Sequence, residues 1–225
     1  MTRVLKVWLV CLALTVLAVW VSYLWLDKPV ALWVNRTVGA VHVPAKLIGS
    51  PLSSTSFITA FAFVVCGLVA ISGRRFLMLG TTITLCVVSA VSTILIKDQL
   101  KLIFGRTWPD TWGQGILSLV RDGVYGFHYF QYGRSFESFP SGHAALTAAV
   151  LSVPCFLFPK LRAGVVICIV VIDASLVMLN LHFLGDVIAG TFVGFSSGLF
   201  TVYLWRATYS RLAAETTPIM VREFG

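Results

Sequence analysis

Two short stretches of this chain carry residues whose types and spacing suit catalysis. The sequence FPSGH spans residues 139–143, and HFLGD spans residues 182–186. A histidine at the mouth of a helix can act as a nucleophile or as a proton donor. The aspartate four residues after His182 lies one helical turn away and can fix the tautomer of that imidazole. A Ser-Gly pair that opens a helix offers unpaired backbone N–H groups to an anion. Together the two stretches indicate a site that handles phosphate.

The composition indicates the surroundings of this site. The chain has 225 residues, of which 58% are hydrophobic and 12% are charged. Soluble domains are about half apolar and a quarter charged, so a polytopic membrane protein is expected. The net charge of +8 is then a sign of topology, and we expect no nucleic-acid partner. The cysteines lie in apolar runs without paired spacing, which predicts free buried thiols and neither disulfides nor a metal cluster.

Apolar runs of membrane-spanning length position the two motifs. We expect an all-α bundle of six transmembrane helices that forms a single integral-membrane domain over residues 1–225. The first run lacks a small-x-small cleavage site and is longer than a signal-peptide core, so it is taken as a span. The predicted spans are residues 4–25, 56–72, 76–96, 142–158, 162–181 and 184–205.

The segments between the spans have different characters. The helical pattern of the third span continues to Phe104. Residues 27–55 read as an interfacial loop or short helix, and residues from Arg206 onwards read as a short polar tail. Residues 105–140 form the longest polar stretch, and their many aromatic side chains predict packing at the level of the lipid headgroups.

The charges of the short turns predict the orientation. The N-terminus, the turns after the second and fourth spans, and the tail are rich in Lys and Arg. By the positive-inside rule both termini should be cytoplasmic, with the motif-bearing loops on the periplasmic or luminal face. The compact chain favours a bacterial inner membrane.

A family resemblance rests on residues spread from the third span to the sixth. In chain order they are Lys101, Gly105, Arg106, Pro109, Pro140, Ser141, Gly142, His143, Ser175, His182 and Asp186. In this order, and at the ends of consecutive spans, they resemble the motifs of the type 2 phosphatidic acid phosphatase superfamily. The resemblance covers roughly the second half of the chain, with the site-bearing part at residues 97–190, and the six-span layout fits it.

The resemblance implies a metal-independent phosphatase without a cofactor that works through a phosphohistidine. His182 would attack phosphorus, Asp186 would hold its other ring nitrogen, and His143 would protonate the leaving oxygen and later help to activate water. The phosphoryl oxygens would be bound by cations and preorganised donors. These ligands would be Lys101, Arg106, the Ser141 hydroxyl and the Gly142 backbone N–H.

The chain departs from the family pattern at two arginines. The family's K-x6-R-P motif, counted from Lys101, places Trp108 at the arginine. Its S-R-x5-H-x3-D motif, counted back from His182, places Leu176 at the second arginine. Because a guanidinium fork suits phosphate better than an ammonium does, we expect Arg106 or Arg134 to replace what is missing.

Three further features invite interpretation. Asp173 lies in the middle of a span, where a carboxylate needs a partner, and Lys97 is the expected one. Lys97 could instead widen the cationic site. Glycines at positions 190, 194 and 198 form a small-residue face that should let another helix of the same chain approach closely.

The expected activity is hydrolysis of a phosphate or pyrophosphate end group from a lipid. Polyprenyl pyrophosphate, phosphatidylglycerophosphate, phosphatidate and a phosphorylated lipid A all remain candidates, and the sequence leaves the oligomeric state open. Two alternatives stay open as well: a lipid phosphotransferase that uses the same site, and a non-catalytic lipid-phosphate binder or transporter. The retained histidines and Asp186 argue against the binder.

Overall fold

Apolar helices build almost all of the described part of the protein, which in this computed structural model is residues 3–38, 76–111 and 115–223. Helix α1 (Arg3–Val21) continues through a π-helical turn (Ser22–Leu26) into α2 (Asp27–Thr37), and α5 spans Phe76–Phe104. The next helices are α7 (Gly142–Leu157), α8 (Arg162–Met178) and α9 (Leu184–Glu223). The short elements are α6 (Leu119–Asp122) and the 3-10 turns Arg134–Phe136 and Pro159–Leu161. Those residue ranges contain no β-strand, only three isolated bridges in the loop after α5.

Within the described residues, four helical stretches are long and apolar enough to cross a membrane. They are Arg3–Thr37, Met78–Phe104, Pro159–Met178 and Leu184–Tyr209, and the shorter apolar helix Gly142–Leu157 lies among them. Many of their large apolar side chains face outward, such as Val10, Leu14 and Trp20 on α1. Exposing these side chains to water would cost free energy, whereas exposing them to the hydrocarbon core of a membrane does not. The all-α membrane fold predicted from the sequence is confirmed.

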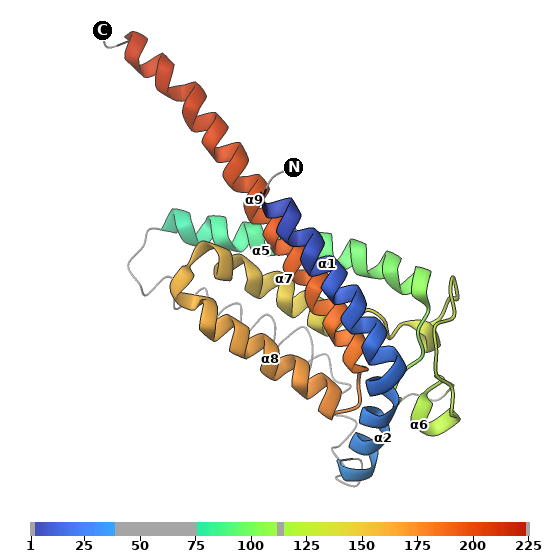
Figure 1. Ribbon diagram of the computed structural model, residues 1–225. Coiled ribbons are helices and arrows are strands. Elements are labelled where there is room, and N and C mark those ends of the chain that lie inside the picture. The colour runs from blue at the N-terminus through green and yellow to red at the C-terminus, as the bar shows by residue number, and fades with distance from the viewer. Residues whose placement is uncertain (1–2, 39–75, 112–114, 224–225) are drawn as a thin grey trace.

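The predicted spans correspond closely to the observed helices. Of the six predicted spans, five coincide with described helices, and the span predicted at residues 56–72 lies outside the described residues, so the total of six stays a prediction. The short helix expected within residues 27–55 is α2 as far as Thr37. The polar tail predicted from Arg206 onwards belongs to α9, which continues as a helix to Glu223. Figure 1 shows this last part of α9, in red, extending beyond the other helices.

Helix α7 lies at the centre and is almost entirely buried, from Ala144 to Cys155. It packs most closely against α9, where the glycines of α9 face the backbone of α7. A Cβ at Gly194 would come within 2.0 Å of the Ala145 carbonyl oxygen, and one at Gly198 within 1.9 Å of the Ser152 hydroxyl. Only glycine permits this approach, so the predicted intrachain role of the small-residue face is confirmed.

The other helices surround this pair. Helix α5 contacts α7 through the Ser89 hydroxyl, which donates to the Ala149 carbonyl at 2.9 Å. Helices α1 and α9 run side by side in opposite directions (Figure 1). The Trp8 indole of α1 donates to Ser196 of α9 at 2.9 Å. As a result, the end of α5, the starts of α7 and α9, and the end of α8 meet near the turn from α1 into α2.

Candidate active site

The two histidines of the motifs meet where these helix ends converge. His143 lies in the first turn of α7, and His182 lies in the short turn between α8 and α9. Their ring centroids are 5.8 Å apart. The Ser141 backbone N–H donates to the Asp186 carbonyl at 3.0 Å and ties the starts of α7 and α9 together. Motifs separated by some forty residues in sequence therefore form one site.

The hydrogen bond of His182 defines which nitrogen can react. Nδ1 lies 3.1 Å from the Ser138 carbonyl oxygen and 3.8 Å from Oδ2 of Asp186. A carbonyl oxygen can only accept, so Nδ1 must carry the hydrogen and Nε2 must hold the lone pair. The imidazole is 2% exposed. The tautomer is thus the one a nucleophilic Nε2 requires, and Ser138 contributes to it more closely than Asp186 does.

Asp186 is fully buried and has several donors. Its Oδ2 accepts from the Ser138 hydroxyl at 2.6 Å and from the Phe183 backbone N–H at 3.1 Å. Its Oδ1 accepts from Arg106 at 2.6 Å. A buried carboxylate with this many donors is held ionised and fixed in orientation.

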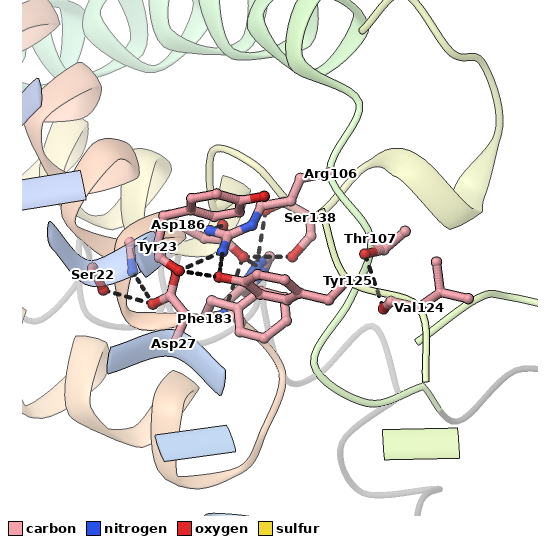
Figure 2. A network of polar contacts seen from close by, with 12 residues as sticks. Ser22, Tyr23, Asp27, Arg106, Thr107, Val124, Tyr125, Ser138, Phe183 and Asp186 are labelled. Carbon is pink, nitrogen blue, oxygen red and sulfur yellow. Dashed lines mark hydrogen bonds and ion pairs between the residues drawn. The ribbon is translucent and has the colours of Figure 1, made fainter. Parts of the chain in front are cut away.

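Arg106 does not line an open phosphate site in this structure. Its side chain has no exposed surface, and its two terminal nitrogens contact Asp186 at 2.6 Å and Asp27 at 2.5 Å. Arg106 is expected to bind phosphate, but in this structure both terminal nitrogens of its guanidinium are already bound to carboxylates. Figure 2 shows Arg106 between the two carboxylates.

Aromatic rings enclose the guanidinium. Its central carbon lies between 4.4 and 5.4 Å from the ring centroids of Tyr23, Tyr125, Phe127 and Phe183. Burial by itself would lower the pKa of Arg106, but the charges of Asp186 and Asp27 outweigh it and raise that pKa above its ordinary value. Burial raises the pKa of Tyr125, opposed in part by the charge of Arg106. The guanidinium is therefore permanently charged.

Asp27 completes this cluster from the N-terminal part of the chain. Its Oδ1 accepts from the Ser22 hydroxyl at 2.6 Å and from the Gly185 backbone N–H at 3.0 Å, at the start of α9. The Tyr125 hydroxyl donates to the Tyr23 carbonyl at 2.7 Å. We refer to Asp27, Arg106 and Asp186 as the Arg106 cluster.

The groups expected to cradle phosphate gather around the start of α7. A Cβ at Gly142 would lie 3.9 Å from Nζ of Lys101 and 3.6 Å from the side chain of Lys97. The side chains of Lys97 and Lys101 therefore flank the N-terminus of α7 beside His143. Nδ1 of His143 is buried with no hydrogen-bond partner among the described residues. The Ser141 hydroxyl is buried and accepts from the Ala144 N–H at 3.3 Å as a helix cap.

The two positions at which the family motifs, as counted from the sequence, are expected to have arginines have different surroundings. Trp108 packs against His182 with ring centroids 5.2 Å apart, and its indole donates to the Arg134 carbonyl at 2.6 Å. The Arg134 side chain itself is exposed. Leu176 is buried in an apolar cluster with Ala144 and Val187. An aromatic ring and an aliphatic side chain thus lie at the two positions where arginines are expected.

The pairing of Asp173 with Lys97 is wrong. Lys97 pairs with its neighbour Asp98, and Asp173 accepts from the Thr191 hydroxyl at 2.6 Å. Asp173 lies on the wall of an apolar groove of about 1030 Å³ between α1, α8 and α9, away from the histidines. The two side chains belong to different parts of the bundle.

Sequence reasoning missed Asp27 and Ser138. Asp27 falls in a stretch without periodicity, and Ser138 lies just outside the FPSGH motif. One signal was available for Asp27: a carboxylate directly after an apolar span needs a partner.

The sequence also resembles proteins that are already known. Residues 77–210 match the sequence model of the PAP2 superfamily. A lipid A 1-phosphatase from Rhizobium etli is 29% identical over 234 residues, covering 96% of this chain and 94% of that protein. A lipid A 1-phosphatase from Rhizobium johnstonii is 30% identical over 132 residues, covering 58% of this chain and 51% of that protein.

A solved structure has the same fold. The crystal structure of a transmembrane PAP2-type phosphatidylglycerolphosphate phosphatase from Bacillus subtilis superposes with a TM-score of 0.52 at 20% sequence identity. The superposition covers 92% of this chain and 98% of the other.

Proposed function

Because the chain belongs to the PAP2 superfamily and is an integral-membrane lipid phosphatase, we propose that it removes the phosphate monoester from a phosphorylated glycolipid of the lipid A type. The observation that carries this choice of substrate is the similarity to a lipid A 1-phosphatase over nearly the whole of both chains. Polyprenyl pyrophosphate, phosphatidate and phosphatidylglycerophosphate are the competing lipids.

The reaction we propose has two steps. Nε2 of His182 attacks phosphorus and forms the N–P bond while the ester P–O bond breaks, and His143 gives a proton to the leaving oxygen. Water then attacks the phosphohistidine, His143 takes its proton, and the N–P bond breaks to release inorganic phosphate. The 3.1 Å contact of Nδ1 with the Ser138 carbonyl and the 5.8 Å separation of the two rings support these roles.

The phosphate is bound, in this proposal, at the start of α7. Lys101, the Gly142 N–H and the Ser141 hydroxyl would contact its oxygens, and Arg134 would reach it from the loop. The position of Lys101 close to Gly142 supports the first two, because a cation beside free helix N–H groups stabilises charge on transferring oxygens. Arg106 is assigned a positioning role in place of phosphate binding, since both ends of its fork are occupied.

We also propose that the site faces the periplasm of a bacterial inner membrane, with both termini cytoplasmic. The start of α1 and the end of α9 lie at the same end of the bundle, opposite α2 and α6 (Figure 1), which agrees with the basic flanks at that end. A cysteine introduced at exposed Tyr132 should react with a membrane-impermeant maleimide in intact cells. Labelling only after lysis would reverse the orientation.

The test of the reaction is phosphate release from purified protein in detergent. The substrates are lipid A 1-phosphate, phosphatidate, phosphatidylglycerophosphate and undecaprenyl pyrophosphate, each with and without chelator. Release from lipid A at a rate at least about tenfold above the others, unaffected by chelator and abolished by vanadate, is expected. Equal rates on all four would overturn the substrate assignment alone.

His182→Ala tests the mechanism. Loss of a nucleophile should reduce the turnover number by a factor of about 10³ or more, and acid-quenched wild-type enzyme should carry phosphate on histidine. A variant as fast as the wild type would remove the phosphohistidine proposal. Transfer of phosphate to a second lipid without inorganic phosphate would identify a phosphotransferase, and no turnover of any lipid would favour a binder.

A further inference from the structure

The buried charges behind His182 do not balance one another. Arg106 contacts Asp186 at 2.6 Å and Asp27 at 2.5 Å, and none of the three side chains has exposed surface. Two carboxylates and one guanidinium leave one net negative charge in the protein interior. Burying an excess charge is costly, so this imbalance calls for a positive partner.

Without Asp27, Arg106 would neutralise the catalytic carboxylate. Asp186 faces His182 through Oδ2 and faces Arg106 through Oδ1. A guanidinium with no other counter-ion would cancel the charge of Asp186 at such short range. Because Asp27 occupies the other end of the fork, Arg106 can fix the orientation of Asp186 while the cluster as a whole stays negative.

A further positive group arises at His182 during the proposed reaction. When Nε2 of His182 bonds to phosphorus while Nδ1 keeps its hydrogen, the ring gains positive charge. The nearby cation is Lys101, which Glu137 and Asp98 also approach, whereas the carboxylate in contact with the His182 ring is Asp186, whose Oδ2 lies 3.8 Å from Nδ1. The cluster is the negative group packed against the ring, and preorganised charge of this kind stabilises a transition state at no cost in reorganisation.

We propose that Asp27 is a positioning residue for the phosphatase reaction: it supplies the counter-charge of Arg106, so that Asp186 retains its negative charge toward His182. This inference rests on the proposed function. It places part of the catalytic machinery outside residues 77–210, the region that matches the family. Figure 2 shows Asp27 reaching Arg106 from the segment that carries Ser22 and Tyr23.

The surroundings of Asp27 suit this role. Its other oxygen accepts from the Ser22 hydroxyl and from the Gly185 N–H, so the carboxylate is fixed against the first turn of α9, one residue before Asp186. The ammonium group of Lys28 lies over the ring of Tyr125 at 4.6 Å from its centroid. The Asp27 charge is therefore directed to Arg106 and to the start of the helix that carries Asp186.

The first experiment compares Asp27→Asn with the wild type. The variant keeps the size and hydrogen-bonding oxygen of the side chain and removes its charge. Its turnover number should fall about 10–100-fold with KM within about twofold, because the effect is on charge development and not on binding. Acid quenching should show slower formation of phosphohistidine. Asp27→Glu, which restores the charge, should recover part of the rate.

The second experiment separates charge balance from structural support. In the double variant Asp27→Asn with Arg106→Gln, Asp186 is no longer neutralised and the cluster regains one negative charge. Turnover should be at least about threefold faster than in Asp27→Asn alone, a non-additive recovery that lost packing cannot produce. A folded double variant that is no faster than Asp27→Asn overturns the proposal. If Asp27→Asn does not fold, the double variant is compared with the wild type, and a folded double variant more than about 100-fold slower overturns the proposal.

Ser89→Ala is the matched control. It removes a buried hydroxyl from the contact of α5 with α7, twelve residues before Lys101 and so about 18 Å along the helix axis. It should lower the melting temperature and leave turnover per folded molecule unchanged. Asp27→Asn with an unchanged turnover number in an active protein contradicts the role of Asp27 alone. A wild-type protein that releases no phosphate from any lipid contradicts the proposed function instead.

Discussion

Two buried regions of this protein hold together by opposite means. In the contact of α7 with α9, backbone lies on backbone, and the glycines and alanines that form it carry no charge. In the Arg106 cluster, charged side chains lie at hydrogen-bond distance inside a shell of aromatic rings. The stability of the helix contact depends on side-chain volume, and the stability of the Arg106 cluster depends on charge balance. A substitution that adds side-chain volume should therefore be harmful in the contact of α7 with α9. A substitution that removes a charge should be harmful in the Arg106 cluster.

The largest effect is expected from removing the central charge of the cluster. Arg106→Met keeps much of the volume but leaves two buried carboxylates without their cation, at a cost of about 3–5 kcal/mol in the free energy of unfolding. Thermal unfolding in detergent, followed by tryptophan fluorescence, measures it. The control Arg206→Met alters an exposed side chain and should cost less than about 1 kcal/mol. Equal stability of the two variants would show that the cluster is not held by charge.

A smaller effect is expected from adding one carbon to the helix contact. In Gly194→Ala the new Cβ would lie 2.0 Å from the Ala145 carbonyl oxygen, so the helices must separate. The expected cost is about 1–3 kcal/mol, from overpacking against backbone. Gly80→Ala is the matched control, since nothing lies within 4 Å of its Cβ, and it should gain up to about 1 kcal/mol from helix propensity. If both variants gained stability, volume would not limit this contact.

The smallest effect is expected at Tyr125, one of the aromatic rings around the Arg106 cluster, and this effect on stability should depend on pH. Tyr125→Phe removes hydrogen bonds to the Tyr23 carbonyl and to Arg106 and should cost about 0.5–1.5 kcal/mol at neutral pH. Burial raises the pKa of Tyr125 above 10.0, so at alkaline pH the unfolded chain loses this proton first. The stability that the wild type has over the variant is complete below pH 10.0 and should shrink as the pH rises further. A difference that stays constant through the alkaline range would contradict the assignment.

The same contrast explains what the sequence could predict. The helix contact follows from glycines four residues apart on one helix, a local period that can be read directly. The meeting of His143, His182 and Asp186 followed from short motifs at span ends. Asp27 and Arg106 are separated by 79 positions, and no period or motif links them. Pairings of this kind depend on how helices far apart in the chain come together.

The incorrect pairing of Lys97 with Asp173 has a physical cause. Lys97 was paired with Asp173 because both charges had to be satisfied, but each found a nearer partner, Asp98 in one case and Thr191 in the other. The residues after Arg206 are polar, which predicts a tail beyond the last span, and the structure adds that this tail is helical. Polarity indicates departure from the membrane, but it does not end a helix.

The length of α9 has a consequence for the whole molecule. Forty residues of helix measure about 60 Å, twice the thickness of the hydrocarbon layer at about 30 Å. A helix that starts at the catalytic surface must leave the bilayer on the opposite side and continue as a rod through water. A fluorophore attached near residue 223 should therefore stand some 20–30 Å clear of that membrane surface, and its distance from the lipid would report the tilt of the helix that carries Asp186.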